Sequence, residues 1–165
     1  MTLMKLAISL SISAPGAGKG TQAELLAKKF NFIHLDTGKH LERILHSPEA
    51  ERDPVLNREQ INFDTGKLTT PRWILCQARR EAEIIAASGK GLVFSGSPRT
   101  LYETFGDKKE EGLAATFARL YGKENVYFIK LDIDEKTTLE RNSKRMVCSV
   151  ERFPVLTKED KERCR

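Results

Sequence analysis

A glycine-rich stretch from Ser13 to Thr21 constrains this chain more than any other feature. It reads Ser-Ala-Pro-Gly-Ala-Gly-Lys-Gly-Thr, follows an apolar run over 6–12 and precedes a helical pattern over 22–29. A strand, a glycine-rich turn and a helix N-terminus in that order can cradle phosphate, because glycine permits the required backbone angles and the helix dipole favours an anion. The stretch therefore predicts a site for the phosphates of a nucleotide.

Within this loop, each type of group has its own predicted role. Lys19 supplies a full positive charge, and the hydroxyl of Thr21 is a candidate ligand for a magnesium ion. The standard P-loop pattern has a glycine where this chain has Ser13, and it places Ser or Thr where this chain has Gly20. The residues predicted to hold the nucleotide phosphates are Gly16, Ala17, Gly18, Lys19, Gly20 and Thr21.

Length and charge restrict the class of protein. A chain of 165 residues can bury roughly two-thirds of its unfolded surface, so we expect one domain over 1–165. The net charge of +5 is dispersed among acidic residues, whereas a nucleic-acid binder gathers its basic residues on one face with aromatic platforms. The N-terminus has no signal-peptide pattern, and no apolar run approaches 18 residues. We expect a cytoplasmic monomer with neither a nucleic-acid nor a membrane partner.

The rest of the chain alternates between strand and helix patterns. Strands are predicted at about 4–12, 31–35, 91–95 and 125–131, and helices at about 19–30, 37–46, 54–65, 71–88, from 100, and 135–145. Strands rich in Val, Ile and Phe that alternate with helices indicate right-handed βαβ units and a parallel sheet covered on both faces. We predict a three-layer α/β/α nucleotide-binding fold with a helical subdomain over 36–71.

A second motif follows the strand predicted at 91–95 and reads Gly-Ser-Pro-Arg-Thr. Its arginine, Arg99, comes at the carboxyl end of a parallel strand, where ligands of open α/β sheets bind. The planar guanidinium suits bidentate binding of a phosphate group. Arg99 is therefore predicted to face the same crevice as the glycine-rich loop.

The loop, with its glycine between lysine and threonine, resembles the phosphate loop of adenylate kinases and other nucleoside monophosphate kinases. The family pattern Asp-Gly-Phe-Pro-Arg-Thr matches Gly96, Pro98, Arg99 and Thr100, and this chain departs from it at Ser95 and Ser97. The resemblance covers about residues 5–152, the first three-quarters of the family pattern. It implies transfer of the γ-phosphoryl group of ATP·Mg²⁺ to a nucleoside monophosphate, AMP being the family default.

The resemblance also implies an acceptor half of the site. Its Thr-Gly motif corresponds to Thr37 and Gly38, its Gly-Lys-Leu segment to residues 66–69, and its base-reading glutamine to Glu103. Where the family has an arginine one turn after the threonine, this chain has Glu42 followed by Arg43. The residues that the resemblance assigns to the acceptor are Thr37, Gly38, Lys67, Leu68, Thr69, Gly96, Arg99 and Glu103.

Glu103 is the departure with the largest chemical consequence. An ionised carboxylate only accepts hydrogen bonds, so it cannot donate to N1 of adenine as a glutamine does. A base edge with two donors, as on guanine, would suit it better. We hypothesise that AMP is not the best acceptor; a solvated helix glutamate without base contact is the alternative.

Two arginines of the helix predicted at 135–145 complete the donor half. Arg141 and Arg145 are four residues apart and share a helix face. The resemblance implies that one packs against the donor adenine and the other reaches the transferring phosphates. Lys19, Arg99 and Arg145 are then the cationic catalytic residues, and 146–165 is part of a lid.

Three cysteines carry weaker signals. Cys76 lies in a helical pattern, and we expect it to be buried. An odd number of cysteines without a secretion signal argues against a disulfide framework. Cys148, Glu151 and Cys164 could ligate zinc as an open half-site, but such a site is a poor structural one and zinc is not favoured.

Two other functions fit the same motifs. One is a small P-loop kinase that phosphorylates a sugar or a shikimate-like alcohol. The Thr37-Gly38 and Pro98-Arg99-Thr100 motifs count against it. The other is a nucleotide-binding module without transferase activity, in which the changes at Glu42, Ser95 and Glu103 have altered the site.

Overall fold

A computed structural model describes residues 5–10, 13–144, 146–148, 154–155, 161–162 and 164. The chain divides into two compact units. The first unit consists of Met1–Ser13 and Lys19–Leu131, and the second of Ala14–Gly18 and Asp132–Arg165. The division expected from the sequence, one domain with a helical subdomain over 36–71 and a partial lid over 146–165, stays a prediction.

The first unit is built on a parallel sheet with the strand order β2-β3-β1-β4. The strands are β1 (Ala7–Ser9), β2 (Ile33–Asp36), β3 (Leu92–Ser95) and β4 (Val126–Phe128). In the register, Ala7 lies between Leu92 and Val126. The predicted α/β fold with a parallel sheet is confirmed.

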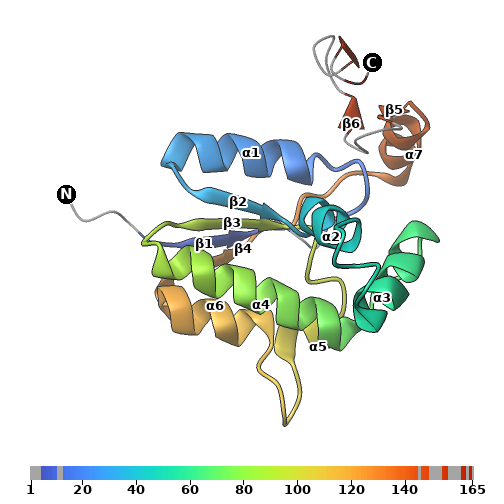
Figure 1. Ribbon diagram of the computed structural model, residues 1–165. Helices are drawn as coiled ribbons and strands as arrows, with labels where there is room; N and C mark the ends of the chain where they lie inside the picture. The colour runs from blue at the N-terminus through green and yellow to red at the C-terminus, as the bar shows by residue number, and fades with distance from the viewer. Residues whose placement is uncertain are drawn as a thin grey trace. The chain divides into compact units, whose positions relative to one another are not determined.

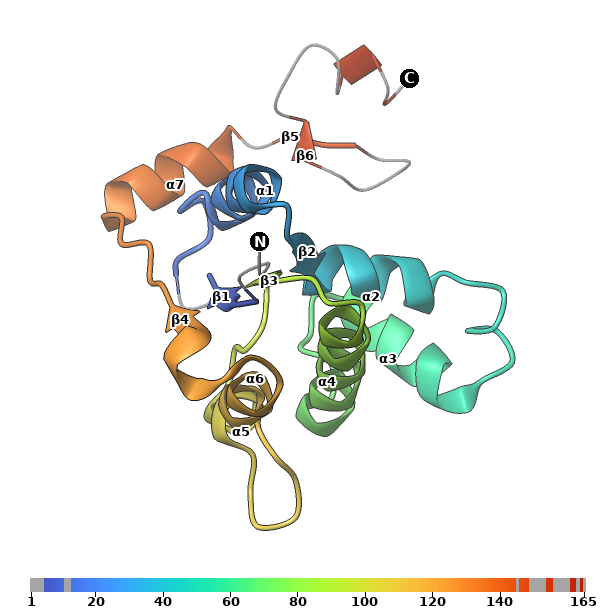
Figure 2. The ribbon, with the colours of Figure 1, turned by 90° about the vertical axis from the view of Figure 1, so that its left-hand side faces the viewer.

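Helices cover both faces of this sheet, as Figures 1 and 2 show from two directions. On one face lies α1 (Lys19–Phe30), and on the other lie α4 (Pro71–Ala87) and α6 (Leu113–Tyr121). Two helices, α2 (Thr37–Leu45) and α3 (Pro54–Asp64), lie between β2 and α4 in the chain. The predicted three layers are therefore present.

Alternation along the strands explains the layers. Leu92 and Phe94 of β3 pack with Leu75 of α4 and Phe117 of α6, whereas Val93 packs with Ala23 of α1. Successive strand residues point to opposite faces of a sheet. Because every residue of β3 is buried, the strand is apolar on both faces, as parallel strands under two helical layers must be.

One long helix was expected from residue 100, but the chain forms two. The first, α5 (Leu101–Phe105), ends at Gly106, and α6 starts only at Leu113. Gly106 adopts φ +71, and a side chain there would overlap the backbone of Glu110 and Gly112. The intervening turn, closed by a bridge between Gly106 and Glu111, interrupts the helix where the helical pattern alone shows no break.

The second unit contains α7 (Glu135–Ser143), whose N-cap Asp134 accepts a hydrogen bond from the Thr137 N–H. Its β5 (Met146–Val147) pairs antiparallel with β6 (Pro154–Val155). Cys148 and Cys164 form a disulfide, with Cα atoms 5.6 Å apart. The expectation of no disulfide was wrong, because an odd cysteine count still allows two of the three cysteines to pair.

Cys76 also differs from the expectation. It lies in α4 as predicted, but it is exposed rather than buried. The buried side of α4 consists of Ile74, Leu75, Ala78, Ala82 and Ile85, which leaves Cys76 on the opposite side. None of the helices in the described ranges has the length and apolarity that a membrane crossing requires.

Glu59 joins α3 to the start of α4. Its carboxylate is fully buried and accepts hydrogen bonds from the Thr70 backbone N–H at 2.7 Å and the Thr70 hydroxyl at 2.6 Å. The Arg58 guanidinium donates to it at 2.8 Å. A buried carboxylate with three donors stabilises the turn between the two helices.

We predict that Glu59→Ala lowers the free energy of unfolding by about 2 kcal/mol, because the Thr70 N–H loses its acceptor. Urea denaturation followed by circular dichroism measures the change. Glu51→Ala, at an exposed glutamate, serves as the control and should leave the unfolding free energy within about 0.5 kcal/mol of wild type.

Comparison of wild type with Glu59→Ala also tests the charge of Glu59. Burial raises the pKa of this carboxyl, but the hydrogen bonds from Thr70 and Arg58 outweigh it, so the net pKa is lowered. A pKa lowered on folding adds stability above the unfolded value of about 4.3, and this stability is lost as pH falls through the folded value. The gap between wild type and Glu59→Ala should therefore narrow below about pH 4. A gap that is constant from pH 7 to pH 3 would contradict this role.

Candidate functional site

The glycine-rich loop has the backbone geometry that the sequence predicts. Gly16 and Gly18 adopt φ +81 and φ +84. Within the second unit, the Arg141 guanidinium donates a hydrogen bond of 3.1 Å to the Gly16 carbonyl. A side chain at Gly16 would meet Cβ of Arg141 and Oδ1 of Asn142 at 3.4 Å. The positive φ angles favour glycine at both positions, and a glycine-rich turn of this kind fits a phosphate group.

The two residues that flank this loop belong to the first unit and are joined to each other. Lys19, the first residue of α1, donates from Nζ to the Ser13 carbonyl at 2.8 Å. The Ser13 hydroxyl in turn accepts a hydrogen bond of 2.7 Å from the Leu131 N–H. Ser13, where the standard pattern has glycine, thus ties the end of one strand segment to the segment after β4. Thr21 lies exposed in the first turn of α1, so its hydroxyl fits the oxygen ligand that Mg²⁺ prefers.

The predicted acceptor residues meet in one pocket of about 30 Å³ in the first unit. They come from α2, from the turn before α4 and from the segment after β3. The predicted residues that line it are Thr37, Leu68, Thr69, Gly96, Arg99 and Glu103. Gly38 and Lys67 do not line it. Gly38 instead donates its N–H to Asp36, the N-cap of α2, at 2.8 Å.

Thr37 and Gly96 form the back of this pocket. The Thr37 hydroxyl is buried and donates to the Ser95 carbonyl at 3.1 Å. Gly96 adopts φ +92, and a Cβ at this position would overlap the Thr37 hydroxyl. Only glycine therefore lets β3 end against the start of α2.

Arg99 is exposed, and its orientation is fixed by a hydrogen bond of 2.7 Å from Nε to the Gly96 carbonyl. Arg99 also lines the pocket, and this bond does not use the two terminal nitrogens of the guanidinium. Two parallel N–H donors of this kind match the oxygens of a phosphate group.

Glu103 lines the pocket and is also held by its own turn. Its buried carboxylate accepts hydrogen bonds from the Ser97 hydroxyl, from the Arg99 N–H at 3.0 Å and from the Thr100 hydroxyl at 3.1 Å. Ser97 and Glu103 are two of the positions where the chain departs from the family pattern, and they bond directly to each other. Sequence reasoning treated them separately and missed the pair.

Ser95, the third departure, is paired as well. Its hydroxyl lies 2.8 Å from Nε2 of His34 on the neighbouring strand β2. Burial lowers the pKa of His34, and this effect outweighs the opposing charges of Asp36 and Glu24. His34 is therefore neutral at pH 7. No role was predicted for His34. The available signal was its position in a strand next to the strand that carries Ser95.

Two further residues that the sequence singled out, Glu42 and Arg43, lie elsewhere. Arg43, on α2, contacts Nδ1 of His40 at 3.3 Å, and Glu42 contacts His46. Neither Glu42 nor Arg43 lines the acceptor pocket. Arg145 lies outside the described residues, so its predicted catalytic role stays a prediction.

The predicted zinc half-site includes Glu151, which lies outside the described residues. Cys148 and Cys164 are joined to each other, so neither is a thiolate ligand in this structure. In the described ranges, no three His, Cys, Asp or Glu side chains are grouped to hold a metal ion.

Comparison with known families shows which family the chain belongs to. The family model described as AAA domain matches residues 12–152. The match includes the glycine-rich loop from Ala14 to Thr21, the strands β2, β3 and β4, and α7. The chain belongs to this family.

Curated relatives narrow the comparison to adenylate kinases. The chain is 32% identical over 136 residues to the adenylate kinase of Vanderwaltozyma polyspora, covering 82% of this chain and 56% of that protein. It is 30% identical to the adenylate kinase of Brevibacillus brevis and 31% identical to that of Kluyveromyces lactis, covering 58% and 55% of those proteins. The resemblance to adenylate kinases is confirmed, and the chain spans little more than half the length of these relatives.

The Ser97–Glu103 contact yields a prediction about stability. Ser97→Ala and Glu103→Ala, alone and combined, should show a coupling of roughly 1–3 kcal/mol in the free energy of unfolding, because a buried hydrogen bond to a charged group joins them. A cycle of Ser97→Ala with the distant Glu51→Ala is the control and should be additive. Additivity in both cycles would show that the Ser97–Glu103 contact contributes nothing to the free energy of unfolding.

Proposed function

We propose that this chain is a nucleoside monophosphate kinase of the adenylate kinase type. The observation that carries the proposal is the pocket in which Thr37, Thr69, Gly96, Arg99 and Glu103 meet, although they come from separate segments. A nucleotide-binding loop alone fits many P-loop proteins. The convergence of these residues around the oriented Arg99 supports a second, phosphate-bearing substrate.

In the proposed reaction, an oxygen of the acceptor phosphate attacks the γ-phosphorus of ATP as the bond to the bridging oxygen breaks. The products are ADP and a nucleoside diphosphate. Lys19 would neutralise charge on the donor phosphates, and Arg99 would hold the acceptor phosphate by two N–H donors. Magnesium, held by the nucleotide and by Thr21, would supply further neutralisation of the phosphate oxygens. Arg145 is proposed as a third cation on the transferring group.

Catalysis of this kind depends on position rather than on covalent chemistry. Phosphoryl transfer needs the two reacting oxygens in line and the equatorial charge neutralised. The hydrogen bond from Arg99 to Gly96 and the bonds around Glu103 support this proposal, since they hold the acceptor residues before substrate binds. Such preorganisation lowers the reorganisation needed at the moment of transfer.

Replacement of Lys19 tests the proposal directly. Lys19→Met keeps the length of the side chain and removes its charge, so it should lower turnover roughly 100- to 1,000-fold. A coupled assay for ADP measures transfer, and far-UV circular dichroism checks the fold. Lys28→Met, at an exposed lysine near the end of α1, is the matched control and should leave turnover unchanged. Near-normal turnover of Lys19→Met would refute the assignment.

Glu103 is the proposed determinant of the acceptor base. If its carboxylate accepts from the base, GMP should exceed AMP as acceptor by roughly tenfold, the factor that about 1.4 kcal/mol supplies. Glu103→Gln should move the preference toward AMP. Turnover of AMP, GMP, CMP and UMP measures it.

Ser97→Ala is the control for this acceptor screen, because it perturbs the same turn without changing the group at position 103. An AMP preference that Glu103→Gln leaves untouched would exclude a base-reading role. A preference that moves equally in both variants would assign the effect to the turn.

The pairing of Ser95 with a neutral His34 favours one alternative, a nucleotide-binding module without transferase activity. The related pattern has a carboxylate at this position to order the hydrated magnesium, and a bonded hydroxyl brings no charge. ATP binding by calorimetry, together with no detectable diphosphate product from any of the four acceptors, would favour this alternative.

A further inference from the structure

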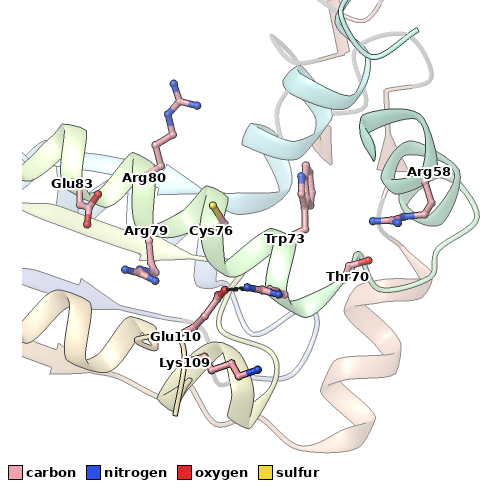
Figure 3. A pocket seen from close by; sticks show the side chains of 10 residues that line it. Arg58, Thr70, Trp73, Cys76, Arg79, Arg80, Glu83, Lys109 and Glu110 are labelled. Carbon is pink, nitrogen blue, oxygen red and sulfur yellow. Dashed lines mark hydrogen bonds and ion pairs between the residues drawn. The ribbon is translucent and has the colours of Figure 1, made fainter. Parts of the chain in front are cut away.

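A groove of about 670 Å³ lies on the outer face of α4 (Figure 3), and it shares no lining residue with the acceptor pocket. The side chains of α4 that face away from the core form its floor. Arg58 of α3 closes one end, and Lys109 and Glu110, from the turn between α5 and α6, border it on another side. None of the residues that line it belongs to the proposed transfer site.

The groove is strongly basic. Five of its lining side chains are Arg or Lys and two are Glu. Figure 3 shows the ion pair of 2.6 Å between Arg72 and Glu110. Arg80 and Lys109, by contrast, have no ion pair with any described side chain, and Nε of Arg79 is buried without an acceptor. The Arg79 guanidinium still pairs with Glu111 at 3.6 Å, and Figure 3 shows it on the side of α4 opposite Arg80. Arg80 is therefore the unpaired cation on its side of the helix, and it favours an anionic ligand there.

An aromatic ring and an unpaired cation stand on the same side of α4. Trp73, Cys76 and Arg80 follow one edge of the helix in Figure 3. Arg80 comes seven positions after Trp73, so the two residues are two helical turns, or about 10 Å, apart along the axis. The small Cys76 side chain between them leaves space. The Trp73 ring packs against the cluster of Leu41, Leu45 and Ile74, so its position is fixed.

We propose that this groove is a second nucleotide site, separate from the transfer site. The planar base would stack on Trp73, the phosphate would bind Arg80, and Arg58 would lie beside the ring. The volume suits one small ligand. A nucleic-acid strand would need successive aromatic platforms, and Trp73 is the one aromatic residue that lines the groove. This inference does not depend on the proposed phosphoryl transfer.

Two residues of the groove report directly on its occupancy. Trp73 is the single tryptophan of the chain, and Cys76 is the free cysteine of the described residues. AMP should quench the Trp73 fluorescence and slow maleimide labelling of Cys76 at least fivefold. Arg80→Ala should weaken AMP binding at least tenfold in both readouts. Arg52→Ala, at an exposed arginine outside the groove, is the matched control and should bind AMP as wild type does.

The same titration in a Lys19→Met, Arg99→Ala double variant separates this site from the proposed transfer site. Persistence of both signals in the double variant supports a second site even if transfer itself is never observed. Loss of both signals there would overturn the inference, as would equal AMP affinity of Arg80→Ala and Arg52→Ala. Inorganic phosphate and adenosine, tested separately, should each bind at least tenfold more weakly than AMP. Equal affinity for phosphate alone would exclude recognition of the base.

Discussion

Burial of β3 between β1 and β2 is the constraint on which the first unit depends. Leu92, Val93 and Phe94 have no exposed surface, and their side chains alternate between the two helical layers. Each contributes roughly 1.5–3 kcal/mol of hydrophobic stabilisation. A shift by one residue would exchange the faces of all three, so the register is fixed. The position of Ser95 and Gly96, immediately after this strand, is fixed with it.

The acceptor pocket follows from that fixed strand end. Because β2 pairs with β3 up to Asp36 and Ser95, α2 starts beside the point where β3 ends. The Thr37 hydroxyl then reaches the Ser95 carbonyl, and Gly96 leaves it the space to do so. The site is therefore a consequence of sheet register rather than of loop conformation alone, which explains why distant segments can supply its residues.

Much of this arrangement could be predicted from the sequence. The period of apolar residues located all four strands of the sheet, and glycine or proline marked the limits of α3 and α4 at Gly66 and Pro71. Side-chain pairing could not be predicted in the same way. The bond of Ser97 to Glu103 forms within a turn and leaves no periodic pattern in the sequence, and the bond of Ser95 to His34 depends on the register of β3 against β2. The disulfide between Cys148 and Cys164, 16 positions apart, likewise follows from no periodic pattern in the sequence.

These pairs change how the departures from the family pattern should be understood. Considered one at a time, the departures at Ser95, Ser97 and Glu103 would each remove from the site a group that the family pattern has there. In the folded chain they are not isolated, because two of them satisfy each other and the third is satisfied by His34. A buried polar group without a partner destabilises a protein by about 1–3 kcal/mol, and these hydrogen bonds offset that cost for the three side chains. The three departures are therefore better regarded as an alternative set of hydrogen bonds around the end of β3 than as separate losses of site residues.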